Sequence, residues 1–73
     1  MKEFKRGDII VDTTIAYNQT RYPILILRER ENNFYCLDSR DFEPVIIGKD
    51  WIDQYAIVDS IDINKVIGFL KEE

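Results

Sequence analysis

The chain contains no histidine, one cysteine, three glycines and two prolines among its 73 residues. Without histidine it lacks the usual general base near neutral pH and the commonest metal ligand. The single cysteine, Cys36, excludes both an intramolecular disulfide and a cysteine-based zinc site. No glycine-rich phosphate loop or dinucleotide fingerprint is present. We therefore expect no metal ion and no cofactor, and any catalysis would have to be metal-independent.

Long apolar stretches are also missing. The charged start of the chain lacks the apolar region of a signal peptide, and the longest apolar run, residues 22–27, is too short to cross a bilayer. We expect a cytoplasmic protein that does not contact membranes. With 45% hydrophobic and 33% charged residues the composition is that of a folded globule. Residues 1–73 predict one small domain, whose modest core makes a homodimer an open possibility.

Charge is distributed unevenly along the chain. The net charge is −4, yet residues 1–30 carry six basic and four acidic groups, and residues 31–73 carry four basic and ten acidic groups. An acidic domain is a poor general nucleic-acid binder, because such binding comes mostly from Lys and Arg neutralising phosphates. The basic residues of the first part would form either a mixed-charge solvated surface or a patch that holds short RNA. They are Lys2, Lys5, Arg6, Arg21, Arg28 and Arg30.

Closely spaced turn signals predict a chain of short strands. Apolar and β-branched stretches favour strands near residues 9–11, 22–27, 34–38, 42–48 and 55–61, with a loop over residues 12–20 and one helical turn at Trp51 and Ile52. The stretch 22–27 is apolar on both faces, which predicts a central strand. Pro44 indicates an edge strand or a bulge, because proline has no N–H for a second neighbour.

The last segment changes to a helical period. Asp62 is a suitable N-cap, and apolar residues then recur at helical spacing, which predicts a helix near residues 62–72. The predicted fold class is therefore mainly β. It is a small SH3-like bent barrel of about five short strands with a C-terminal helix.

Few side chains could carry chemistry. Aspartate pairs three residues apart occur at 38 and 41, 50 and 53, and 59 and 62, and we interpret them as turn or helix caps rather than metal ligands. Cys36 is expected to be a small buried hydrophobe. A domain this small needs most of its aromatic residues for its core, so we expect core packing rather than base stacking for most of the set Trp51, Tyr55, Tyr35, Phe34 and Phe42. Tyr17 and Tyr22, which lie near Arg21 in a polar region, are the aromatic candidates for ligand contact.

Three stretches resemble the PemK/MazF family of toxin-like barrels. They are "KRGDIIVD" near the start, "RYPILIL" at residues 21–27, and "AIVDSIDINKVIGFL" at residues 56–70, in the order found in the family and covering about half the chain. The resemblance implies a compact bent barrel of PemK/MazF type, frequent dimers and, in active members, cleavage of single-stranded RNA. An antitoxin-like protein would then be one kind of partner.

The resemblance also implies site residues. The family arginine that precedes proline corresponds to Arg21, which would stabilise negative charge on phosphate. The family threonine falls near Ser39, so that Asp38, Ser39 and Arg40 become candidates for assisting proton transfer. Tyr22 is inserted between Arg21 and Pro23, and a shift of one residue turns a strand side chain to the opposite face. Candidate binding residues are Lys5, Arg6, Tyr17, Tyr22 and Arg28.

Three functions follow from the sequence. The first, which the acidic charge and the shifted arginine favour, is a non-catalytic binding or regulatory module for a protein partner or a short nucleic acid. The second is a reduced toxin-type endoribonuclease. The third is a structural subunit whose sheet edges pair with copies of itself.

Overall fold

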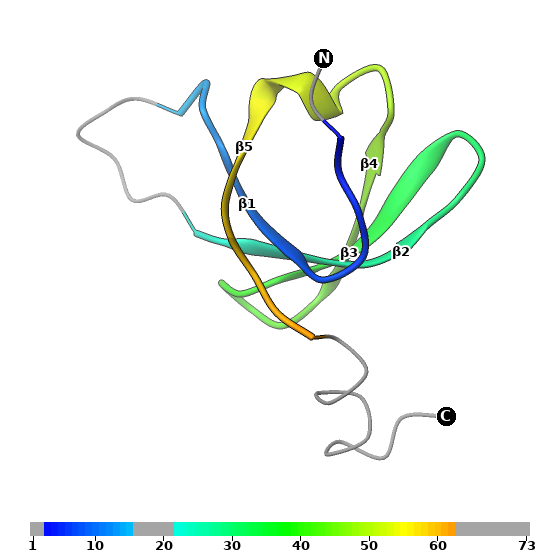
Figure 1. Cartoon of the computed structure of the whole chain (residues 1–73). Helices are drawn as coiled ribbons and strands as arrows, with labels where there is room; N and C mark the ends of the chain where they lie inside the picture. The colour runs from blue at the N-terminus through cyan, green and yellow to red at the C-terminus, as the bar shows by residue number, and fades with distance from the viewer. Residues whose placement is uncertain (1–2, 16–21, 63–73) are drawn as a thin grey trace.

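The computed structural model describes residues 3–15 and 22–62. They form five β-strands and one short 3₁₀-helix, shown in Figure 1. The elements are β1 (Asp8–Asp12), β2 (Ile24–Glu29), β3 (Asn33–Asp38), β4 (Pro44–Gly48), η1 (Ile52–Gln54) and β5 (Tyr55–Ser60). The strands make one antiparallel sheet in the order β4-β3-β2-β1-β5, so β2 is its central strand.

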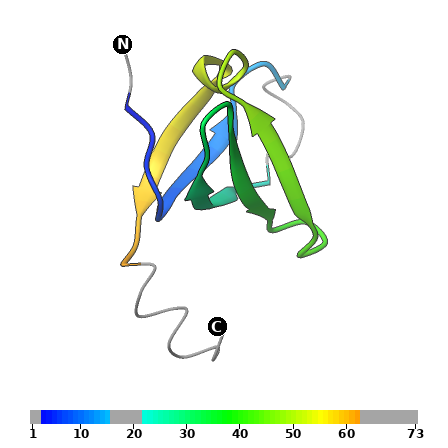
Figure 2. The same cartoon turned by 90° about the vertical axis from the view of Figure 1, so that its right-hand side faces the viewer.

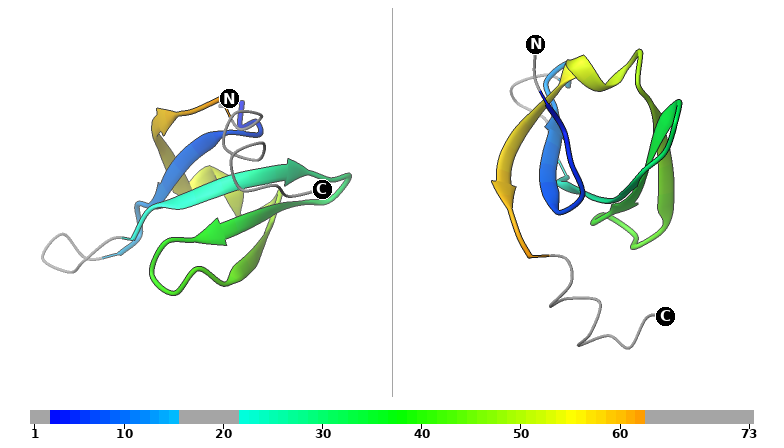
Figure 3. Two further views of the ribbon diagram at one scale, coloured as in Figure 1. Left: turned by 90° about the horizontal axis from the view of Figure 1, so that it is seen from below. Right: turned by 45° about the vertical axis from the view of Figure 1, so that its right-hand side comes forward.

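The sheet is strongly curved but not closed. One extra residue on β2 lies between the pairs at Ile26 and Arg28, and the register of β1 with β5 also shifts, between Ile9 and Ile10. Such bulges bend a sheet and increase its twist. The curvature brings the edge strands round toward each other, and the segment with η1 connects them at one end (Figures 2 and 3). Within the described residues β4 and β5 do not pair, which leaves two sheet edges.

The core lies inside this curve. It consists of the buried side chains Phe4, Ile10, Ile24, Ile26, Phe34, Cys36, Ile47 and Ile52. Alternate residues of β1 to β4 supply most of it, as the two-residue period of a strand requires. Phe4 comes from the N-terminal segment and packs edge-on against Phe34, with ring centroids 6.3 Å apart. Isoleucine dominates this interior.

The Gly7-Asp8 pair fastens the start of β1. Gly7 has a φ of 96°, a backbone conformation that glycine adopts readily, and its N–H donates to the carbonyl of Ile26 at 2.8 Å. The carboxylate of Asp8 is fully buried and accepts hydrogen bonds from the main-chain N–H of Lys5 at 3.0 Å and from the hydroxyl of Ser60 at 2.7 Å. The pair therefore ties three segments together.

Most sequence predictions about the strands are confirmed. The structure contains five short strands, β2 is central, Pro44 opens an edge strand, and a helical turn follows Trp51. The sheet is open rather than a hydrogen-bonded barrel, because its outermost strands do not pair in the described part of the chain. The predicted helix near residues 62–72 lies outside the described residues, apart from Asp62, which follows β5.

Candidate functional site

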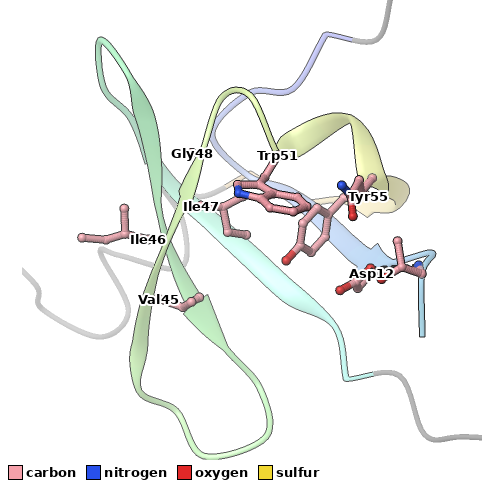
Figure 4. A pocket seen from close by; sticks show the side chains of 9 residues that line it. Asp12, Val45, Ile46, Ile47, Gly48, Trp51 and Tyr55 are labelled. Carbon is pink, nitrogen blue, oxygen red and sulfur yellow. Dashed lines mark hydrogen bonds between the residues drawn. The ribbon is translucent and has the colours of Figure 1, made fainter. Parts of the chain in front are cut away.

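A pocket opens on the concave side of the sheet, between β4 and the end of β1. Its volume is ≈ 320 Å³, which is at the lower end of the range of about 300–1,000 Å³ for ligand sites. In Figure 4 the side chains of Trp51, Tyr55 and Ile47 gather on one side of β4 and Asp12 lies beyond Tyr55, whereas Ile46 points away. The lining residues are Asp12, Thr14, Val45, Ile46, Ile47, Gly48, Trp51, Gln54 and Tyr55.

Trp51 is held at the pocket by a tight turn after β4. Its main-chain N–H donates to the carbonyl of Gly48 at 2.9 Å, and its own carbonyl accepts from the N–H of Gln54 at 3.0 Å. The residue is nevertheless 59% exposed. The backbone of Trp51 is thus fixed while its indole ring remains accessible, which is typical of aromatic residues that anchor a partner.

The turn also brings the carboxylate of Asp50 close to Gly48. A Cβ atom at Gly48 would lie 2.7 Å from Oδ1 of Asp50, closer than real Cβ atoms approach an oxygen. Gly48 lines the pocket, whereas Asp50 does not. Glycine at this position therefore lets an acidic side chain fold back over the strand end.

Asp12 and Tyr55 form the opposite wall of the pocket. They are cross-strand partners at the ends of β1 and β5. Oδ1 of Asp12 accepts hydrogen bonds from the N–H and the hydroxyl of Thr14, at 2.9 and 2.6 Å. Burial raises the pKa of Tyr55, and the negative charge of Asp12 raises it further. The phenol therefore stays neutral beside an acidic neighbour.

The structure brings part of the predicted catalytic set together at residues that do not line this pocket, although the charge of Asp38 also raises the pKa of Tyr55. Oδ2 of Asp38 pairs with the Arg40 guanidinium at 3.4 Å, and Oδ1 accepts from the main-chain N–H of Arg40 at 2.9 Å. The same guanidinium carbon lies 6.0 Å from the ring centre of Tyr22. Ser39 is exposed in this turn, and its N–H donates to the carbonyl of Pro23 at 3.1 Å. Arg21 and Tyr17 lie outside the described residues.

The predicted basic binding residues do not meet at the pocket. Lys5 and Arg6 belong to the segment before β1, and Arg28 is exposed near the end of β2. Nζ of Lys5 pairs with the buried carboxylate of Asp8 at 3.2 Å. Lys49, the basic residue next to the Gly48 turn, pairs with Glu29 at 2.8 Å. The positive charge nearest the turn is therefore already balanced.

Cys36 and the aspartates behave as capping and packing residues. Cys36 is fully buried, and burial raises the pKa of its thiol to about 12, so it is not a nucleophile near neutral pH. Asp38, Asp41 and Asp59 each accept a main-chain N–H one or two residues ahead. In the part of the chain that the structure describes, no three acidic or sulfur ligands gather to hold a metal ion.

The assignment of aromatic residues to the core was wrong for two of them. Phe42 is 75% exposed at the tip of the β3–β4 hairpin, and Trp51 is exposed at the pocket. A sequence signal existed for Trp51, because it directly follows the turn residues Gly48, Lys49 and Asp50. Nothing in the sequence pattern pairs it with Asp12, which lies 39 positions earlier.

Comparisons of the chain with protein-family models, curated proteins and solved structures find no match. Within residues 3–15 and 22–62, no helix has the length and apolar content to span a membrane. The residues around the pocket are therefore the basis for assigning a function.

Proposed function

We propose that this chain is a small, non-catalytic protein-binding module on an SH3-like barrel of PemK/MazF type, and that the pocket beside Trp51 is its binding site. One observation carries the proposal. Trp51, which is 59% exposed, lines a pocket with both polar and apolar walls while its backbone is fixed by two turn hydrogen bonds. Rigid, exposed aromatic side chains in such pockets supply much of the free energy of protein–protein binding.

The charge around the pocket favours a protein over a nucleic acid. Asp12 lines the pocket, whereas Lys49, the cation beside the Gly48 turn, is paired with Glu29. A phosphate would be repelled by the carboxylate of Asp12 and would meet no Lys or Arg among the lining residues, and affinity for nucleic acids depends on such cations. A protein segment without phosphate groups meets no such electrostatic repulsion.

The cluster at the β3–β4 turn favours binding over catalysis as well. Asp38 accepts two hydrogen bonds from Arg40, one of them from the guanidinium. The same guanidinium also lies over the ring of Tyr22. An endoribonuclease needs a group ready to accept a proton and a cation ready for phosphate. In this turn the candidate groups satisfy one another.

Selection from a displayed library of random peptides tests the proposal. The intact chain is used as bait, and the selected peptides are measured by titration against the wild type, Trp51→Ala and Phe42→Ala. Phe42→Ala is the matched control, because it removes an exposed aromatic ring that does not line the pocket. We expect binding to weaken at least about tenfold in Trp51→Ala, which is the loss typical of an anchor residue, and to stay unchanged in Phe42→Ala.

Two results would overturn the proposal. One is that no peptide is selected, or that every selected peptide binds Trp51→Ala as tightly as the wild type. The other is cleavage of mixed-sequence single-stranded RNA that disappears in Arg21→Ala, which would establish the toxin-type endoribonuclease instead. Light scattering of the chain at micromolar concentration completes the test, because a monomer excludes the self-associating subunit.

A further inference from the structure

The outer edge of β4 carries main-chain groups that the sheet does not use. In the β3–β4 pair, the N–H of Asp38 donates to the carbonyl of Glu43 at 3.0 Å, and the N–H of Lys49 donates to that of Asn32 at 3.0 Å. Hydrogen-bonded positions alternate along an antiparallel pair, so residues 43, 45, 47 and 49 bond toward β3. The N–H and carbonyl of Ile46 therefore point toward the open edge.

Ile46 is the suitable pairing position on that edge. Pro44 has no N–H, and the carbonyl of Gly48 already accepts from Trp51. Between them, Ile46 offers both a donor and an acceptor, and β4 has no second strand neighbour among the described residues. Ile46 lines the pocket although its side chain points away (Figure 4), because its backbone forms the pocket wall. An unpaired strand edge of this kind is a template for an added strand.

The pocket beside this edge matches a cation with a flat, apolar body. Trp51 and Tyr55 present aromatic rings, and Asp12 supplies negative charge beside Tyr55. A guanidinium stacks on aromatic faces and pairs with carboxylates, which a neutral side chain of the same shape does only weakly. Charge complementarity thus identifies the side chain that the pocket accepts.

We infer that the site takes an extended segment of a partner protein that adds to β4 at Ile46 and places an arginine side chain in the pocket between Trp51 and Asp12. This inference rests on the proposed protein-binding function and names the chemistry of the partner. A partner residue opposite Ile46 would share the outward face of that side chain, and its neighbours along the segment would point inward. The arginine therefore occupies the position next to the one paired with Ile46.

The probe is an acetylated and amidated pentapeptide with a central arginine flanked by valine and threonine residues. The control peptide has citrulline in place of the arginine, which keeps the shape of the side chain and removes its charge. Both are titrated into the ¹⁵N-labelled chain and followed by NMR at the Trp51 indole N–H and the Ile46 amide. We expect the citrulline peptide to bind at least about tenfold more weakly, because it loses both the cation–π contact and the charged hydrogen bonds.

Two variants test the role of charge. Asp12→Asn removes a pocket carboxylate but keeps an oxygen that can accept a hydrogen bond from Thr14. We expect this variant to bind the arginine peptide several-fold more weakly than the wild type. Asp59→Asn is the matched control, since it removes an exposed carboxylate that makes one local hydrogen bond and does not line the pocket. Hydrogen exchange reports the edge pairing, and the Ile46 amide should exchange at least about tenfold more slowly in the complex.

Equal binding of the arginine and citrulline peptides would overturn the inference, as would an Ile46 amide that gains no protection. If library-selected peptides depend on Trp51 but carry no basic residue, the protein-binding function stands and the arginine specificity fails. If no peptide depends on Trp51, the proposed function itself fails. The two failures are therefore distinguishable.

Discussion

Asp12 and Tyr55 lie opposite each other at the ends of β1 and β5, and the carboxylate raises the pKa of the phenol. The pair places a negative charge beside an aromatic ring that packs against the core. The pocket is thus continuous with the interior of the sheet. Changes at this pair should be detectable both in ligand binding and in the titration of Tyr55.

The tyrosine titration provides a first prediction. In Asp12→Asn, the pKa of Tyr55 should fall toward its ordinary value of 10.0, while the contribution of burial, which is the larger cause, persists. Absorbance of the phenolate between pH 8 and 13 measures the change. Asp59→Asn should leave the titration unaltered. Because the folded chain holds the Tyr55 proton more tightly than the unfolded chain does, stability should decrease as the pH rises above about 10. An identical titration of Asp12→Asn and the wild type would contradict this account.

The strands could be predicted because their signals are local. Alternating apolar residues, turn residues and the position of Pro44 depend only on neighbours in the sequence, and the structure agrees with them. Closure of the sheet depends on whether β4 and β5 meet after the bulges have bent the sheet. The bulge on β2, between Ile26 and Arg28, leaves no distinct residue pattern.

The pocket beside Trp51 was not predicted, for a related reason. We assigned the aromatic residues to the core because a small domain needs large side chains to fill it. The interior is instead filled by five isoleucines, Cys36 and the rings of Phe4 and Phe34. Trp51 was therefore not required inside, and only the three-dimensional arrangement shows that it joins Asp12 and Tyr55 around a pocket.

Asp8 provides a prediction about acid stability. Burial raises its pKa, but hydrogen bonds from Ser60 and Lys5 and the Lys5 charge outweigh this effect, so the pKa lies below its ordinary value of 3.8. The folded chain therefore binds fewer protons than the unfolded chain near this pH. The contribution of Asp8 to stability is present above pH 3.8 and is lost as the pH falls through the lower, folded value.

Asp8→Asn should remove this contribution. We expect a loss of about 2–3 kcal/mol at pH 7, because the amide turns an N–H toward donors that the carboxylate had satisfied. Urea unfolding between pH 2 and 7 should also show a flatter acid limb than the wild type. Asp59→Asn, an exposed control, should stay within about 0.5 kcal/mol of the wild type. A similar acid limb in Asp8→Asn and the wild type would refute the role of Asp8.

Cys36 should react only when the chain opens. Its thiol is fully buried with a pKa of about 12, so hardly any thiolate is present at pH 8 in the folded state. Labelling with a disulfide reagent at pH 8 should therefore be slow and should accelerate as urea increases the unfolded population. The chain in concentrated urea provides the fully reactive reference. Equally fast labelling with and without urea would show that the thiol is accessible in the native state.

The left-handed backbone conformation of Phe42 should reduce the stability of the folded chain. It has a φ of 59°, a left-handed conformation that costs a residue with a side chain roughly 1–2 kcal/mol, and its ring is 75% exposed. The hairpin imposes this conformation, because the N–H of Phe42 donates to the carbonyl of Asp38 at 2.8 Å. Phe42→Gly should relieve the strain without removing a core contact, and urea unfolding should show a gain of about 1 kcal/mol.

Ser39→Gly is the matched control in the same turn. Ser39 has no positive φ, so glycine there relieves no strain and only adds freedom to the unfolded chain, with an expected loss of about 0.5–1 kcal/mol. Opposite signs for the two substitutions would locate the strain at Phe42. If both glycine variants are destabilised equally, the left-handed conformation of Phe42 carries no cost.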